Sequence, residues 1–199
     1  MSPLPWLTAD VPGCGGSFKA TPEDFEVEEI PAYEPNGLSD GEHGYLWIEK
    51  RGRSTPEVAK LIARHVGLGE RDVSWAGLKD KHAVTRQWLS LPWKAIAKLE
   101  GLTAPGLTVL KTSRHRNKLK TGHLRGNRFT LVVRGVTDAG AAKAAFEQLI
   151  VRGVPNAFGA QRFGARGDNA ERGRQILLAG GRHRDRFERK LFLSAYQSS

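Results

Sequence analysis

Hydrophobic and polar positions alternate most clearly at residues 25–30, where Phe25 and Val27 fall on one side of an extended chain. Glu26 and Glu28 fall on the other side, and this two-residue period is typical of a half-buried β-strand. Runs rich in β-branched and aromatic residues predict further strands at residues 18–20, 45–50, 107–111 and 128–133. These predicted strands all lie within residues 18–133.

A helical pattern begins after Ser54, which is followed by Pro56 and by Glu57 three residues later. This spacing is that of an N-terminal capping box, so we expect a helix that runs to Val66 and ends at Gly67. Its apolar residues recur at helical spacing and predict a core-facing stripe of Ala59, Ile62, Ala63 and Val66. Further helices are predicted at residues 93–99, 138–151, 168–179 and 184–196.

Residues 73–90 are the segment around which the rest of the chain is organised. Two strand-like runs, 73–76 and 85–91, flank a polar turn at residues 79–82 that Gly77 introduces. In this turn Asp80 stands between Lys79 and Lys81, and neighbouring cations favour the ionised form of a carboxyl group. Asp80 is thus a candidate nucleophile. The alternative is that Asp80 only shapes the turn through hydrogen bonds to the following backbone.

Composition supports a folded protein with a hydrophobic core. The chain has 199 residues, of which 39% are hydrophobic, and its five tryptophans and eight phenylalanines suffice for a core. This length allows one large domain or one domain with part of a second. A single cysteine, Cys14, excludes an internal disulfide framework. Without an apolar run of about 18 residues or a secretory signal, we expect a cytoplasmic protein.

Charge is distributed unevenly along the chain. The net charge is +10, yet the first fifty residues hold ten acids and only two basic residues, Lys19 and Lys50. The remainder is therefore strongly basic, which favours a nucleic-acid partner over a surface that is merely soluble. Residues 111–134 contain no acid at all. We expect RNA contacts from the basic and amide side chains of Lys79, Lys81, Arg114, Arg116, Lys118, Lys120, Arg128, Gln161 and Arg162.

The loop at residues 156–164 mixes aromatic side chains, an amide and a guanidinium with glycines. Such a loop is suited to stacking on single-stranded nucleotides. The alternative, equally supported by the sequence, is that Phe158 and Phe163 anchor a domain junction in the core.

Known cofactor and metal motifs are missing from the sequence. One cysteine and six scattered histidines lack the spacing of metal ligands, so no metal is expected. The sequence contains no nucleophile elbow, phosphate-binding P-loop or dinucleotide fingerprint. What is left is a carboxylate in basic and aromatic surroundings, which suits a reaction on RNA without a cofactor.

Four segments in sequence order, at residues 19–29, 76–88, 120–130 and 154–164, resemble the TruD family of tRNA pseudouridine synthases. The resemblance implies an α+β fold with a mixed, largely antiparallel sheet flanked by helices. It also implies isomerisation of uridine to pseudouridine in tRNA, at position 13. Uracil leaves C1′ of its ribose, rotates, and is rejoined through C5.

The resemblance also implies roles for individual residues. Asp80 matches the essential aspartate of the family, and acts either as the nucleophile at the sugar or as the base that gives a glycal. Phe25 matches the aromatic residue that stacks on the target base, and Asn127 matches the residue that holds the target nucleotide. Lys19 is expected to be the cation paired with Asp80.

Family members are longer than this chain, with an insertion after the segment that residues 156–164 resemble. We therefore expect an incomplete catalytic domain at residues 1–152 and the truncated beginning of an insertion domain at 153–199. Two other functions are compatible with the sequence. One is an inactive basic RNA-binding module or fragment, and the other is a metal-free ribonuclease.

Overall fold

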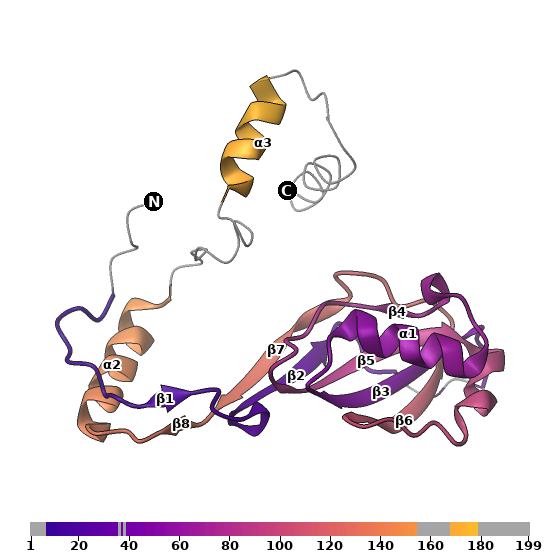
Figure 1. The fold of residues 1–199 in the computed structure, drawn as a ribbon, viewed down its shortest axis with the longest axis horizontal. Helices are drawn as coiled ribbons and strands as arrows, with labels where there is room; N and C mark the ends of the chain where they lie inside the picture. The colour runs from indigo at the N-terminus through magenta and orange to yellow at the C-terminus, as the bar shows by residue number, and fades with distance from the viewer. Residues whose placement is uncertain (1–6, 36, 38, 155–167, 179–199) are drawn as a thin grey trace. The chain divides into compact units, whose positions relative to one another are not determined.

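The computed structural model describes residues 7–35, 37, 39–154 and 168–178. The chain divides into two compact units, one of which spans Cys14–Ala139 and contains the sheet (Figure 1). The other combines the residues up to Gly13 with those from Gly140 onward. The expected division into a catalytic domain and an insertion domain at residue 152 stays a prediction.

A six-stranded sheet forms the centre of the larger unit, and this α+β fold agrees with the expected one. Its strands run in the order β6-β3-β5-β2-β7, and β4 also pairs with β5. Only the β2–β5 pair is parallel among the described strand pairs, so the sheet is mixed and largely antiparallel. The strands are β2 (Phe25–Pro31), β3 (His43–Arg51), β4 (Ser74–Trp75), β5 (Val84–Pro92), β6 (Leu107–His115) and β7 (Leu124–Leu131).

Helix α1 (Thr55–Val66) begins and ends as the sequence predicts. The Ser54 hydroxyl accepts from the Glu57 amide, and the Glu57 carboxylate accepts from the Ser54 amide. These two bonds satisfy amide groups that a helix leaves unpaired at its start. Gly67 ends the helix with φ of +72°, in the left-handed region that favours glycine.

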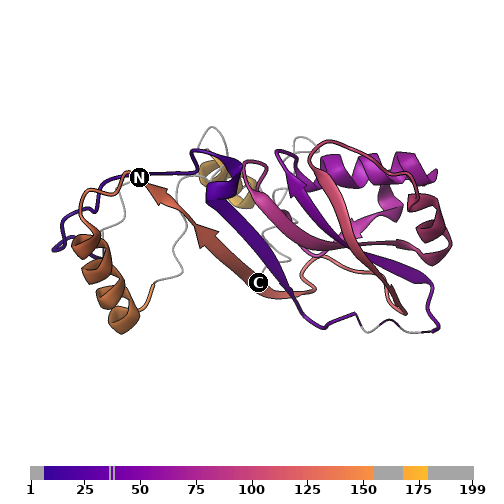
Figure 2. The same cartoon turned by 90° about the horizontal axis from the view of Figure 1, so that it is seen from below.

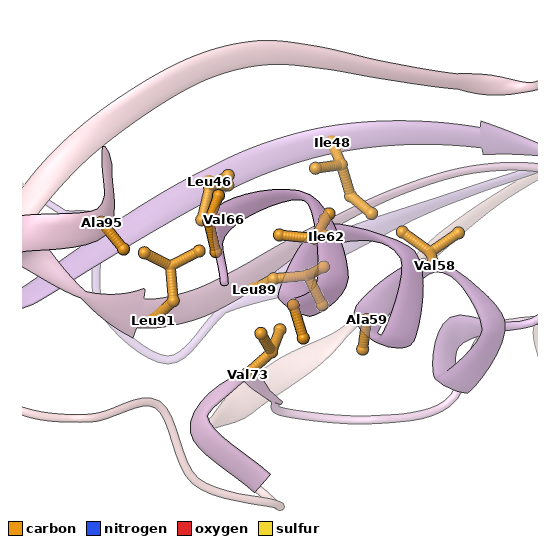
Figure 3. Packing of buried hydrophobic residues seen from close by; sticks show 11 residues of the cluster. Leu46, Ile48, Val58, Ala59, Ile62, Val66, Val73, Leu89, Leu91 and Ala95 are labelled. Carbon is orange, nitrogen blue, oxygen red and sulfur yellow. The ribbon is translucent and has the colours of Figure 1, made fainter. Parts of the chain in front are cut away.

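The main hydrophobic core lies between α1 and one face of the sheet. Figure 3 shows the side chains of Val58, Ile62 and Val66 from the helix gathered against those of the strands, including Leu46, Ile48, Leu89 and Leu91. Ile62 is fully buried, and burial of such a side chain contributes about 1.5–3 kcal/mol. The stripe predicted from helical spacing is therefore confirmed as core.

Two strands divide one edge of β5 between them. Strand β2 pairs with residues Val84 to Arg86, and β4 pairs with Leu89 and Ser90. Between these two pairings, the Trp88 amide donates to the buried Glu29 carboxylate at 3.3 Å. A side chain thus takes the place of a backbone partner where β2 leaves β5, and the same carboxylate accepts from Lys79 in the turn that contains Asp80.

Strands β2 and β7 lie side by side, and β7 forms the edge of the sheet opposite β6 (Figure 2). The predicted strand at residues 128–133 begins earlier, at Leu124, and is interrupted at Val132, whose amide donates to the Asp24 carbonyl. Short β1 (Ser17–Phe18) and β8 (Val133–Arg134) then pair with each other.

Shorter helical elements complete the larger unit. The helix predicted at residues 93–99 is the 3-10 helix η3 (Trp93–Leu99), and η1 (Pro22–Asp24) and η2 (Glu70–Asp72) are single turns. Beyond them lie α2 (Ala139–Arg152) and α3 (Asn169–Leu178), close to the predicted bounds. The predictions for residues 156–164 and 184–196 concern parts of the chain outside the described residues.

No helix among the described residues has the length and apolar character to span a membrane.

Candidate active site

Asp80 lies on the connection between β4 and β5, and both of its carboxylate oxygens accept hydrogen bonds. The backbone amide of His82 donates to Oδ1 at 3.1 Å, which is the bond to the following backbone expected of a turn-forming aspartate. Lys19 Nζ donates to Oδ2 at 2.9 Å. Because 39% of the Asp80 side chain is exposed, the carboxylate shapes the turn and is also accessible from solvent.

Lys19 joins this carboxylate to an aromatic ring. Its Nζ lies 4.0 Å from the centre of the Phe25 ring, within the range of a cation–π interaction. The backbone of Lys19 has φ of +58°, a conformation that costs a non-glycine residue of order 1 kcal/mol or more. The pairing of Lys19 with Asp80, expected from the family resemblance, is therefore present in the structure.

The hydrogen bond from Lys19 holds the pKa of Asp80 below its ordinary value, with partial burial opposing it and the His82 amide adding a smaller effect in the same direction. The neighbouring lysines of the turn are not the cause, contrary to the expectation from sequence. Lys79 Nζ pairs with Glu29 at 2.7 Å, and Lys81 Nζ pairs with Glu57 at 3.3 Å. Asp80 is ionised at neutral pH, but its cation comes from a distant part of the chain.

Phe25 stacks on Phe129, with ring centres 6.0 Å apart and planes 7° from parallel. Phe129 is 56% exposed, and the register of β2 and β7 places it opposite Val27. Sequence reasoning missed Phe129 as a site residue. The signal was present in β7, where Asn127 and Phe129 are two positions apart and therefore share a face.

Asn127 lies opposite Glu29 in the β2–β7 pair. Its Oδ1 is buried, and no donor among the described residues bonds to it. A buried amide oxygen without a donor is costly, so a ligand that donates a hydrogen bond there would be favoured. Strand register thus brings Asn127 to the same face as Phe25 and Phe129.

Hydrogen bonds from side chains of α1 and β5 hold the backbone of the turn in place. The Thr55 hydroxyl donates to the Gln87 amide oxygen at 2.8 Å and accepts from the Lys79 amide at 3.0 Å. Gln87 in turn donates to the Gly77 carbonyl at 3.1 Å. Thr55 and Gln87 are fully buried, so this network ties the turn rigidly to the start of the helix and to the central strand.

Lys79 does not have the position expected for an RNA contact. Its side chain is 3% exposed and its ammonium is occupied by Glu29, whose side chain is fully buried. A cation in this position cannot reach a phosphate without breaking a buried ion pair, so Lys79 is assigned to the framework of the turn.

The basic residues of the 111–134 run are partly neutralised by the acidic beginning of the chain. Arg116 pairs with Asp40, Arg128 lies 3.6 Å from Glu28, and Arg134 pairs with Asp24. Arg114 donates to the carbonyls of Ser39 and Gly41, and Lys118 donates to that of Arg71. Within the described part of the chain, Lys120 and Arg125 have no ion pair. Gln161 and Arg162 lie outside the described residues.

A cavity of about 290 Å³ does not include Asp80, although Glu29, the partner of Lys79, is among the residues that line it. It is lined by Trp47, Trp88 and Lys111 among others, and Lys111 Nζ lies 5.1 Å from the centre of the Trp88 ring. Glu28 belongs to this cavity, whereas its strand neighbour Val27 is buried in the core. The candidate site is therefore defined by the side chains around Asp80.

Fold and site together define an α+β domain whose sheet presents an ionised aspartate, paired with a lysine, beside stacked aromatic rings. The chain belongs to the TruD family: the family model for tRNA pseudouridine synthase D matches residues 4–181.

Individual relatives agree with this assignment. The chain is 53% identical over its whole length to a protein of Anaeromyxobacter dehalogenans named tRNA pseudouridine synthase D, of which it covers 58%. It is 44% identical, over 98% of its length, to a Thermus thermophilus protein of the same name, of which it covers 54%. A crystal structure of a TruD protein from Methanosarcina mazei matches 86% of the chain with a TM-score of 0.70 and 29% identity, and the match covers 40% of that protein. The chain thus spans little more than half of these curated relatives.

Proposed function

We propose that this chain carries the catalytic aspartate of a tRNA pseudouridine synthase, which isomerises a uridine of tRNA, at position 13, to pseudouridine. Family membership supports the reaction class. The observation that carries the assignment to Asp80 is the arrangement around Lys19, which lies 2.9 Å from the Asp80 carboxylate and 4.0 Å from the centre of the Phe25 ring. One side chain thereby holds the carboxylate and an aromatic platform close together.

The reaction breaks the bond between N1 of uracil and C1′ of ribose and forms one between C5 and C1′. With Asp80 as nucleophile, its oxygen bonds to C1′ while the electron pair leaves with uracil. C5 of the rotated ring then attacks C1′, the carboxylate leaves, C5 loses its proton, and N1 gains one. With Asp80 as base, it takes the C2′ proton while uracil leaves with the electron pair of the N1–C1′ bond, which gives a glycal. C5 of the rotated ring then bonds to C1′ as the carboxyl group returns its proton to C2′, and C5 loses its proton and N1 gains one as before. Both routes require an ionised carboxylate. Asp80 meets this requirement at neutral pH, and the hydrogen bond from Lys19 lowers its pKa further below the ordinary value.

The surroundings of Asp80 fit a base taken out of a stacked RNA structure. Extrusion costs a few kcal/mol of stacking, which contact with an aromatic ring partly offsets. Phe25 and its stacked neighbour Phe129 offer such rings. Asn127 offers a buried carbonyl oxygen to a donor of the nucleotide, such as N3–H of uracil. Exposed basic residues, including Lys120 and Arg125, would contact phosphates.

Asp80→Asn tests the assignment. We expect release of tritium from tRNA labelled at C5 of uridine to fall at least about a thousandfold, with tRNA affinity little changed, because the amide keeps the shape and loses the charge. Asp72→Asn is the matched control, since Asp72 caps the Gly69 amide with its carboxylate and asparagine can do the same.

Tritium release, tRNA binding and RNA length together separate the competing functions. Undiminished tritium release by Asp80→Asn would refute the role of Asp80. Tight tRNA binding by the unchanged chain without any tritium release would identify it as a binding module. Shortened RNA on a sizing gel would instead indicate a ribonuclease.

A further inference from the structure

Lys50 is a buried cation close to the candidate site. It is the second-last residue of β3 and pairs with Thr85 of β5 and Leu107 of β6. Its side chain is fully buried, although lysine is among the residues least often found in that state. An ammonium group in the interior needs compensation for its lost hydration.

Backbone carbonyls supply that compensation. Lys50 Nζ donates to the carbonyl oxygens of Arg53 and Asp80, both at 2.7 Å, and to that of Lys79 at 3.5 Å. An ammonium has three donors, so these three acceptors match its capacity. The two shorter bonds have the length typical of charge-assisted hydrogen bonds.

These bonds reach a part of the turn that the other contacts leave alone. Thr55 and Gln87 hold the Lys79 amide and the Gly77 carbonyl, and the Lys79 side chain is held by Glu29. Among the described hydrogen bonds, the one from Lys50 is the only one made to the backbone of residue 80. Since the carbonyl and the carboxylate of Asp80 share one Cα, fixing the carbonyl restricts where the carboxylate can lie.

We propose that Lys50 is a positioning residue for Asp80, which anchors the Asp80 carbonyl from the interior so that the carboxylate meets Lys19. The effect on catalysis rests on the proposed function, but the effect on the turn does not. Sequence reasoning assigned Lys50 to a strand only.

The charge of Lys50 makes this anchor sensitive to pH. Burial lowers the pKa of Lys50 to about 8, with repulsion from Lys79 in the same direction and attraction from Asp80 and Glu57 opposing it. Above this pH the amine has two N–H donors for three carbonyls, so the turn is held more weakly. The contribution of Lys50 to global stability changes in the opposite direction. Between about pH 8 and the ordinary pKa of 10.5 the unfolded chain binds more protons than the folded one, so the free energy of unfolding rises with pH in this range.

Lys50→Met tests the proposal, because methionine keeps the length of the side chain and removes the donors. Hydrogen exchange of peptides covering residues 77–82 is expected to be about tenfold faster at pH 7, with α1 peptides unchanged apart from any global loss of stability. Lys60→Met is the matched control, since Lys60 is an exposed lysine of α1 paired with Glu70. Equal exchange of the turn in wild type and Lys50→Met would overturn the proposal.

Lys50→Gln provides a second variant if Lys50→Met fails to fold. Glutamine keeps two N–H donors without the charge, so the protection of residues 77–82, taken relative to the intrinsic exchange rate at each pH, is expected to be intermediate and independent of pH between 7 and 9.

The pH dependence of turnover provides a second readout, which a purely structural role of Lys50 would not change. We expect kcat of wild type to fall above about pH 8 with KM little changed, and kcat of Lys50→Met to be about tenfold lower without this alkaline fall. An alkaline fall that persists in Lys50→Met would contradict the role of Lys50. If wild type itself has no turnover, the proposed function fails, while the exchange measurement still decides whether Lys50 holds the turn.

Discussion

Two lysine–carboxylate ion pairs involve adjacent residues of one turn, and they differ in how far their side chains are exposed to solvent. Lys79 pairs with Glu29 at 2.7 Å, with side chains that are 3% and 0% exposed. Asp80 pairs with Lys19 at 2.9 Å, with 39% and 32% of the two side chains exposed. One peptide bond therefore separates an ion pair inside the protein from one at its surface.

The comparison teaches that surroundings decide what such a pair does. Removing two charges from water is costly, and each partner of the buried pair compensates the charge of the other. Loss of one partner would leave an uncompensated charge in the interior, so the pair stays together. Solvent screens the exposed pair, so it contributes little to stability, and its exposed carboxylate, ionised at neutral pH, is accessible to a ligand. The buried pair thus holds the turn, and the exposed pair is suited to chemistry.

The largest effect is expected from Lys79→Met, which leaves Glu29 charged and unpaired in the interior. We expect a loss of about 3–5 kcal/mol in the free energy of unfolding, measured by chemical denaturation, because an isolated buried charge is strongly destabilising. The double variant Glu29→Gln with Lys79→Met is the control. Its new amide oxygen would still accept from the Trp88 amide, so most of the loss should be recovered. A single variant as stable as wild type would show that Glu29 is not confined as the structure indicates.

Lys19→Met should affect stability far less. The exposed pair is expected to contribute below about 1 kcal/mol, so chemical denaturation should give nearly the wild-type free energy of unfolding. A loss as large as that of Lys79→Met would remove the distinction between the two pairs.

The smallest effect concerns the pKa of Asp80 and its contribution to stability at acidic pH. Because the Lys19 hydrogen bond lowers the pKa of Asp80 in the folded state, the stabilisation from this group is complete above its ordinary pKa. It is lost as the pH falls through the lower, folded value. Titration of the ¹³C-labelled Asp80 carboxyl group by NMR should give a pKa below the ordinary value in wild type and a higher one in Lys19→Met. Identical titration in both would exclude Lys19 as the cause.

The sequence predicted elements whose signals are local. The limits of α1 follow from Ser54, Glu57 and Gly67, all in contact with the helix ends that they define. The turn at Asp80 follows from its bond to the amide two residues later. By contrast, the sequence pattern around Asp80 indicated the wrong cations, since both adjacent lysines bind other acids. Lys19 was expected only through the family resemblance.

Charge shows the same limit on a larger scale. The basic run was expected to face phosphates because its own segment contains no acid. In the structure, pairing of β2 with β7 brings Glu28 opposite Arg128, and Asp24 and Asp40 approach Arg134 and Arg116. Asp40 is 76 positions from its arginine and Asp24 is 110 from its own, so distant acids reduce the charge available to a polyanion.

The amino-acid sequence by itself determined the helix ends, the period of the strands and the turn that presents Asp80, because the interactions involved join residues a few positions apart. Only the tertiary structure decided which carboxylate each lysine meets and which pair is buried. Lys19 and Asp80 are 61 positions apart, and Glu29 and Lys79 are 50 apart. Burial and partner choice at such separations depend on how the strands pair, so two adjacent residues of one polar turn could acquire opposite surroundings.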